Sequence, residues 1–126
     1  MNEMRVTVPA GREWGLVINL ALGAAGSLAG LSLAVIDDLR SAAEEAFELL
    51  THQERRVEQV TLITSVEHGM FNLALNAHRA EHLTACKPMD PEMAQLIIGT
   101  LVTDVKLEGD HCGIYSVTMA LPAGTK

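Results

Sequence analysis

Aromatic residues, basic clusters and cysteines are all scarce in this sequence. Only 3% of the 126 residues are aromatic, and 9 lysine and arginine residues stand against 16 aspartate and glutamate residues, for a formal net charge of −7. An acidic chain repels phosphate backbones and anionic lipid, and the densest basic run is the pair Arg55-Arg56. The composition therefore argues against nucleic acids and membrane surfaces as partners.

The two cysteines, Cys86 and Cys112, are too few for a disulfide framework, and the first residues do not resemble a secretory leader. Both features favour a reducing compartment and a cytoplasmic location. With 48% hydrophobic residues, a chain of this length can form one core without disulfides or metals. We therefore expect a single domain over residues 1–126.

No residue between Glu13 and Asp37 carries a charge, so residues 14–36 form an apolar run of 23 residues. By length this run could span a bilayer. Its glycines and polar residues, and the acidic residues that follow it, favour two buried helices instead. We expect the break at Gly30, with Ser32 as the N-cap of the second helix.

Hydrophobic periodicity predicts the elements of the first half of the chain. Alternation over residues 4–8 indicates a strand, and three- and four-residue steps indicate helices over 14–30 and 32–50. The stripe expected to be buried in the first helix is Trp14, Val17, Ile18, Ala21, Ala25 and Leu28. The stripe expected in the second helix is Ile36, Leu39, Ala43, Ala46 or Phe47, and Leu50.

The second half of the chain alternates between strand and helix signals. Residues 57–66 and 70–77 predict a hairpin with its turn at 67–69, and residues 90–92 read as the start of a third helix. A second hairpin is expected over 104–121. The resulting order, β-α-α-β-β-α-β-β, favours an α+β two-layer sandwich with the helices on one face of a mostly antiparallel sheet.

His78, His82 and Cys86 are spaced four residues apart, so a helix through residues 76–86 would align three potential zinc ligands. A solvated polar connection explains the same residues, and a single HxxxH pattern without a second ligand pair is a common accident. We therefore expect no metal site. His111-Cys112 has no base or orienting acid near it in sequence, so we expect no nucleophilic cysteine there.

A run in the second helix region resembles a known family. Its residues are Gly30-Leu31-Ser32, Ile36-Asp37-Asp38-Leu39-Arg40, Ala42 and Glu45-Ala46. They are similar to the helix that leads into the N box of bacterial anti-sigma-factor serine kinases, which belong to the GHKL ATPase superfamily. Val8-Pro9-Ala10 and the residues Ile98, Thr100-Leu101 and Asp104-Val105 are also similar. The resemblance covers nearly the whole chain and implies a histidine kinase-like ATPase (Bergerat-type) fold.

The ATP-site motifs of that family depart from its pattern here. The resemblance puts the catalytic glutamate at Glu45, but the asparagine that should hold magnesium is replaced by Leu49. The Asp-x-Gly motif that should contact adenine falls on Ala77 and Arg79, and the glycine-rich box falls on residues 92–95, Glu-Met-Ala-Gln. We therefore expect a degenerate member without ATP or magnesium, in which Glu45 is an exposed remnant of the catalytic base.

The resemblance implies a regulatory protein that acts by protein–protein binding. Its expected partners are a sigma factor or an anti-anti-sigma factor, and homodimers are usual in the family. The alternative is an ATP-dependent serine/threonine kinase that uses Glu45, with ATP and magnesium in a divergent pocket. A third possibility is a small-ligand pocket between helices and sheet, made apolar by the same losses. The acidic group Glu44, Glu45 and Glu48 is expected to be a solvated helix face.

Overall fold

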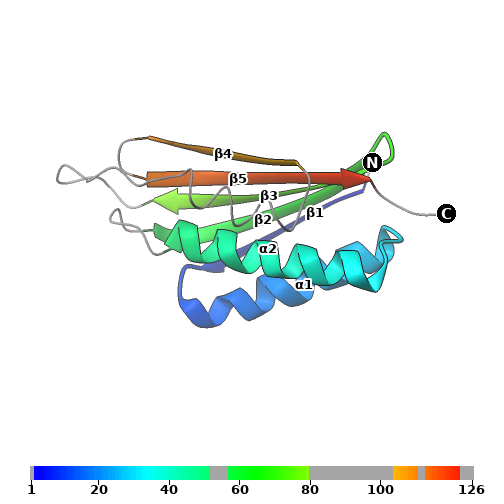
Figure 1. The fold of residues 1–126 in the computed structure, drawn as a ribbon. Helices are drawn as coiled ribbons and strands as arrows, with labels where there is room; N and C mark the ends of the chain where they lie inside the picture. Colours follow the sequence, from blue (N-terminus) through cyan, green and yellow to red (C-terminus); the bar gives the residue numbers. More distant parts are fainter. Residues whose placement is uncertain (1, 52–56, 80–103, 111–112, 123–126) are drawn as a thin grey trace.

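Two helices pack on one face of a five-stranded antiparallel sheet (Figure 1). The computed structural model describes residues 2–51, 57–79, 104–110 and 113–122. Its elements are β1 (Asn2–Pro9), the 3-10 helix η1 (Arg12–Trp14), α1 (Gly15–Leu28), α2 (Leu33–Thr51), β2 (Val57–Glu67), β3 (Met70–Arg79), β4 (Asp104–Asp110) and β5 (Gly113–Pro122).

The strands are arranged in the order β1-β2-β3-β5-β4, and every neighbouring pair is antiparallel. This confirms the expected α+β two-layer class. The order along the chain, β-α-α-β-β-β-β for the described elements, is not the predicted β-α-α-β-β-α-β-β. The third helix was expected to start at residues 90–92, which lie outside the described residues.

The turn between β2 and β3 lies within the predicted residues 67–69, but its loop has two residues, because Glu67 still pairs with Met70. His68 and Gly69 both have positive φ, 52° and 74°. Two consecutive left-handed residues are typical of a type I′ turn, whose twist matches that of antiparallel strands. The sequence predicts the left-handed conformation for Gly69, and His68 adopts it as well.

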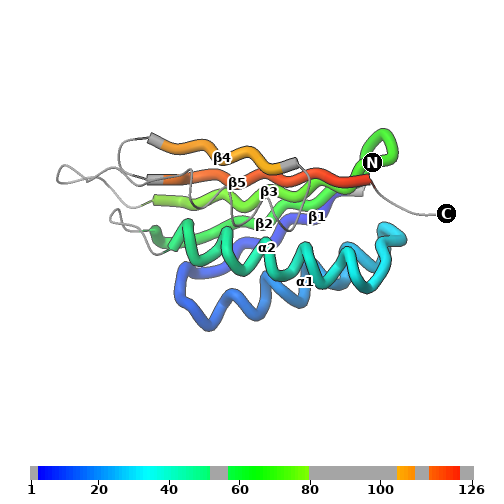
Figure 2. Tube along the Cα trace, in the orientation of Figure 1, coloured from blue at the N-terminus to red at the C-terminus, as the bar shows by residue number. Residues whose placement is uncertain are grey.

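The apolar run breaks into two helices where the sequence predicts it (Figure 2). Gly30 has φ 81°, and the amide of Leu31 donates to the carbonyl of Gly26 at 3.0 Å, which is the bond of a Schellman cap. The Ser32 hydroxyl then accepts a hydrogen bond from the Val35 amide at 3.2 Å and so caps α2. In the described part of the chain, no helix is long and apolar enough to cross a membrane.

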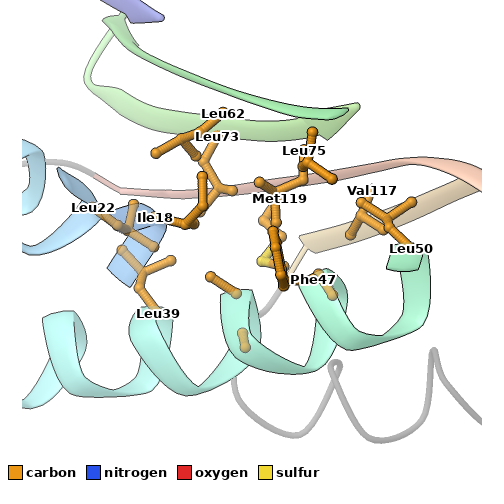
Figure 3. Close-up of a cluster of buried hydrophobic side chains, with 14 of the residues drawn as sticks. Ile18, Leu22, Leu39, Phe47, Leu50, Leu62, Leu73, Leu75, Val117 and Met119 are labelled. Carbon is orange, nitrogen blue, oxygen red and sulfur yellow. The ribbon is translucent and has the colours of Figure 1, made fainter. Parts of the chain in front are cut away.

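The buried face of α2 is the one that its periodicity predicts. Its buried residues are Ile36, Leu39, Ala42, Ala43, Ala46, Phe47 and Leu50. Leucine, valine and methionine side chains meet them from the sheet, and the close-up labels Leu62, Leu73, Leu75, Val117 and Met119 (Figure 3). These strand residues face the helices because cross-strand register aligns Leu62 with Leu75 and Leu75 with Val117.

The stripe predicted for α1 is wrong in part. The helix buries Ile18, Leu22 and Gly26, whereas Trp14, Val17 and Leu28 are 38%, 36% and 90% exposed. Trp14 also lies in η1 and not in α1. Because α1 is apolar on all sides, periodicity cannot tell which of its faces meets the sheet. The contact is decided by the position of α2 and β1, which pack beside it.

Gly26 and Gly23 are one turn apart on α1, and they should respond in opposite ways to alanine. A Cβ at Gly26 would lie 3.0 Å from Cγ1 of the buried Ile36, whereas a Cβ at Gly23 would make an ordinary contact with Cδ of Arg40 at 3.8 Å. We expect Gly26→Ala to lower the free energy of unfolding by about 1 to 2 kcal/mol because of overpacking. Gly23→Ala should raise it by about 0.5 to 1 kcal/mol through helix propensity. Urea denaturation measures both, and equal stabilisation by the two variants would contradict the packing at Gly26.

Candidate functional site

A groove of about 880 Å³ runs between the first half of α1 and the second half of α2. On one side it is lined by Arg12, Glu13, Gly15, Leu16, Ile18 and Asn19. On the other side it is lined by Arg40, Ala43, Glu44, Glu45, Phe47 and Glu48. No strand residue is among these, so this groove is not a small-ligand pocket between helices and sheet, which was the third possibility.

The groove has an apolar floor and a charged rim. Ile18, Ala43 and Phe47 form the floor and are almost completely buried. Gly15 lies beside the Phe47 ring, and a Cβ there would make an ordinary van der Waals contact with Cδ2 at 3.5 Å. The rim carries four glutamates against two arginines, so the lining is acidic overall. Such a surface favours a cationic ligand with an apolar anchor.

One polar contact joins the two helices inside the groove. Arg40 on α2 donates from Nε to Oδ1 of Asn19 on α1 at 2.5 Å, and both residues are half-buried. At the rim, Nη2 of Arg12 and Oε2 of Glu48 are 4.0 Å apart, with the two side chains 84% and 53% exposed. An exposed ion pair of this kind adds little stability, so Asn19 and Arg40 form the stronger link.

Glu45, the candidate catalytic residue, is exposed on α2 and lines the groove. Glu44 and Glu48 are exposed beside it, as expected for a solvated face. Leu49, one turn further along, is half-buried and packs against the hydrophobic core. Ala77 on β3 also packs against that core. The positions at which the resemblance places a magnesium ligand and an adenine acceptor are therefore occupied by aliphatic side chains.

Arg79, at the end of β3, contacts an aromatic residue from a distant part of the chain. Its guanidinium carbon lies 4.9 Å from the centroid of the Tyr115 ring on β5, within the range of a cation–π interaction. The family pattern has glycine at the position of Arg79. The sequence alone does not reveal the contact, because the pairing of β3 with β5 brings together two residues that are 36 positions apart.

The helix considered for residues 76–86 is wrong at its beginning, because residues 76–79 belong to β3. His78 is exposed, and its Nε2 lies 2.7 Å from the Thr61 hydroxyl, which lies 2.8 Å from the Thr7 hydroxyl. These three side chains form a hydrogen-bonded row across β3, β2 and β1. His82 and Cys86 lie outside the described residues, as do Cys112 and the glycine-box positions 92–95. Among the residues that the structure describes, no group of three His, Cys, Asp or Glu side chains could hold a metal.

Comparison with known proteins gives no family assignment. No protein-family model matches the chain, and no curated protein matches it.

Sequence reasoning singled out Glu45 but missed the groove around it. Asn19 and Arg40 are 21 positions apart, and neither belongs to a recognisable motif. Their sequence signal is a polar residue, Asn19, in the first half of a helix whose one other polar side chain is Ser27. A polar side chain in that position needs a partner, and α2 supplies one.

The Asn19–Arg40 hydrogen bond should be measurable in a double-mutant cycle. We expect Asn19→Ala and Arg40→Ala to be coupled by about 1 kcal/mol in the free energy of unfolding. Either single variant already removes the partly buried, charge-assisted hydrogen bond, so the double variant loses less than the sum of the two. The matched control is the cycle of Arg12→Ala with Glu48→Ala, where the coupling should stay below about 0.5 kcal/mol. Additive effects at Asn19 and Arg40 would show that their contact does not hold the helices together.

Proposed function

We propose that this protein is a degenerate relative of the anti-sigma-factor serine kinases, which regulates by binding another protein and does not use ATP. The sequence resemblance within residues 30–46 supports the family. The two-layer α+β arrangement, with the order strand-helix-helix-strand-strand over the first 79 residues, supports it at the level of fold class. The finer assignment to the histidine kinase-like ATPase fold belongs to the same proposal.

The single observation that supports the proposed loss of ATP binding is the packing of Leu49 and Ala77 against the core. Magnesium prefers oxygen ligands, and the adenine amino group needs a hydrogen-bond acceptor. Neither aliphatic side chain supplies one. Arg79 also places a long cationic side chain, in contact with Tyr115, where the family has glycine. Under this proposal Glu45 has no metal-bound phosphate to act on, and it contributes instead to the acidic rim of the groove.

Protein binding is supported by the groove between α1 and α2. Its floor of buried apolar residues can accept an anchoring side chain, and its rim of Glu13, Glu44, Glu45 and Glu48 attracts positive charge. We therefore propose a partner that presents a basic segment with one or two large apolar residues. By resemblance this partner is a sigma factor or an anti-anti-sigma factor.

Mg-ATP should neither bind to the protein nor change its thermal stability. We expect calorimetric titration to give no saturable heat and thermal unfolding to give the same melting temperature with Mg-ATP as with magnesium chloride alone. A ligand present at 100 times its Kd would otherwise add about 2.7 kcal/mol to the free energy of unfolding. Binding in the micromolar range would overturn the proposal in favour of the kinase. Loss of phosphate transfer in Glu45→Gln would then identify the base.

Charge reversal on the groove rim should weaken binding of the proposed partner. We expect Glu44→Lys combined with Glu45→Lys to reduce recovery of one specific host protein at least tenfold in a pull-down, because the rim would then repel a basic segment. Glu58→Lys together with Glu67→Lys, at exposed sites on β2, makes the same charge change away from the groove. Wild type and this control should retain the same protein. Equal retention by the groove variant would place the binding surface elsewhere.

A further inference from the structure

The groove between α1 and α2 is closed at one end by the side chain of Arg40. Asn19 and Arg40 are the groove-lining residues nearest to the reversal between the two helices. Arg40 donates from Nε to Oδ1 of Asn19, and its Cδ lies 3.8 Å from the position that a Cβ of Gly23 would take. The side chain therefore crosses from α2 to α1. Beyond it, Gly26 and Ile36 bring the helices into close contact, and the groove does not continue.

The guanidinium of Arg40 keeps hydrogen-bond donors for a ligand. A guanidinium has five N–H groups, and Arg40 uses the one at Nε on Asn19, which orients the whole planar group. Within the described part of the chain, its two terminal nitrogens have no hydrogen-bond or ion-pair partner. Arg40 is half-buried, so these donors favour an acceptor, and a carboxylate matches their fork with two parallel hydrogen bonds. The closed end of the groove is therefore suited to one carboxylate.

The charge of the groove lining changes sign along its length. Glu44 and Glu48 follow Arg40 on α2 at intervals of four residues, and all three side chains line the groove. Four residues correspond to about 6 Å along a helix. A ligand thus meets a positive group at the closed end, and negative groups about 6 Å and about 12 Å away from it. A segment that is basic throughout would leave Arg40 facing a like charge.

We propose that the groove binds the C-terminal end of a partner chain, with the terminal carboxylate on Arg40. This inference rests on the proposed function and specifies the segment through which the partner binds. A chain end fits a groove that is closed on one side, and its carboxylate carries the charge opposite to that of Arg40. An amino terminus has the same charge as Arg40 and would be repelled there. Asn19 is a positioning residue, because it acts through the guanidinium that it holds.

The spacing of the groove charges also predicts the sequence of this chain end. An extended chain advances about 3.3 Å per residue, so two of its residues cover one interval between the charged groups of α2. Basic residues two and four positions before the last residue therefore reach Glu44 and Glu48. Side chains alternate between the two sides of an extended chain. Apolar residues one and three positions before the last residue then reach the floor of Ile18, Ala43 and Phe47.

Fluorescence polarisation of the full chain with two labelled peptides tests the terminal carboxylate. Both peptides carry fluorescein and a glycine linker at the amino end and finish in Lys-Leu-Lys-Leu-Ser. One has a free carboxyl terminus and the other has an amide. We expect the wild type to bind the free acid at least tenfold more tightly, because the amide removes the charge that Arg40 contacts. This comparison needs no variant of the protein.

Three variants assign the preference to Arg40. Arg40→Gln should bind both peptides with the same Kd, and circular dichroism should show that it keeps the wild-type fold. Asn19→Ala should lower the ratio of the two Kd values on the order of threefold without weakening the amide, because the guanidinium loses its orientation. Arg5→Gln removes the same charge at an exposed site on β1, so it is the matched control and should keep the wild-type ratio.

The other outcomes separate this inference from the proposed function. Equal Kd values for the two peptides in the wild type would overturn the inference. The proposed groove would still stand if Glu44→Lys combined with Glu45→Lys weakened both peptides. Absence of saturable binding by either peptide up to about 1 mM would reject the inference and the proposed basic segment together. An amidated peptide that ends in aspartate and binds as tightly as the free acid would contradict the assignment to a chain terminus.

Discussion

The contact between Gly26 of α1 and Ile36 of α2 is the constraint on which the helix layer depends. The chain reverses over Gly30, and the Leu31 amide donates to the Gly26 carbonyl at 3.0 Å. A Cβ at Gly26 would lie 3.0 Å from Cγ1 of Ile36, so glycine relieves the contact between the two helices. This reversal places α1 and α2 side by side on one face of the sheet (Figure 1). Ile18 and Leu22 then meet the core from α1, while Leu39 and Phe47 meet it from α2.

The groove follows from the same arrangement. At the end far from the reversal, Gly15 lies beside Phe47, and both residues line the groove. Asn19 and Arg40 link the helices within the groove, and the glutamates of α2 line its rim. Packing of the helices thus forms an acidic groove that is lined without any strand residue.

The proposed loss of nucleotide binding and the proposed protein-binding surface are consistent with each other. Leu49 and Ala77 add to the core at the positions where an ATP site would need polar ligands. Their burial favours stability, whereas unpaired polar groups at the same positions would cost free energy. The groove rim between α1 and α2 is the surface that we propose for function. It is suited to contact with a protein, which agrees with the proposed regulator.

Local sequence signals determined the elements that depend on neighbouring residues alone. Alternation predicted β1 and the β2–β3 hairpin, Gly30 and Ser32 predicted the break between helices, and the spacing of apolar residues predicted the buried face of α2. Glu45 was correctly expected to be exposed. Each of these follows from short-range periodicity or capping, which a chain shows before it folds.

Only the tertiary structure decided which face of α1 is buried and where the groove lies. A helix that is apolar on every side has no preferred face until α2 and β1 are packed beside it, so Leu28 proved exposed and Leu22 buried. The hydrogen bond of Arg40 to Asn19 and the contact of Arg79 with Tyr115 likewise join residues far apart in sequence. Such contacts depend on strand order and helix packing, because these alone set the distances between separate segments.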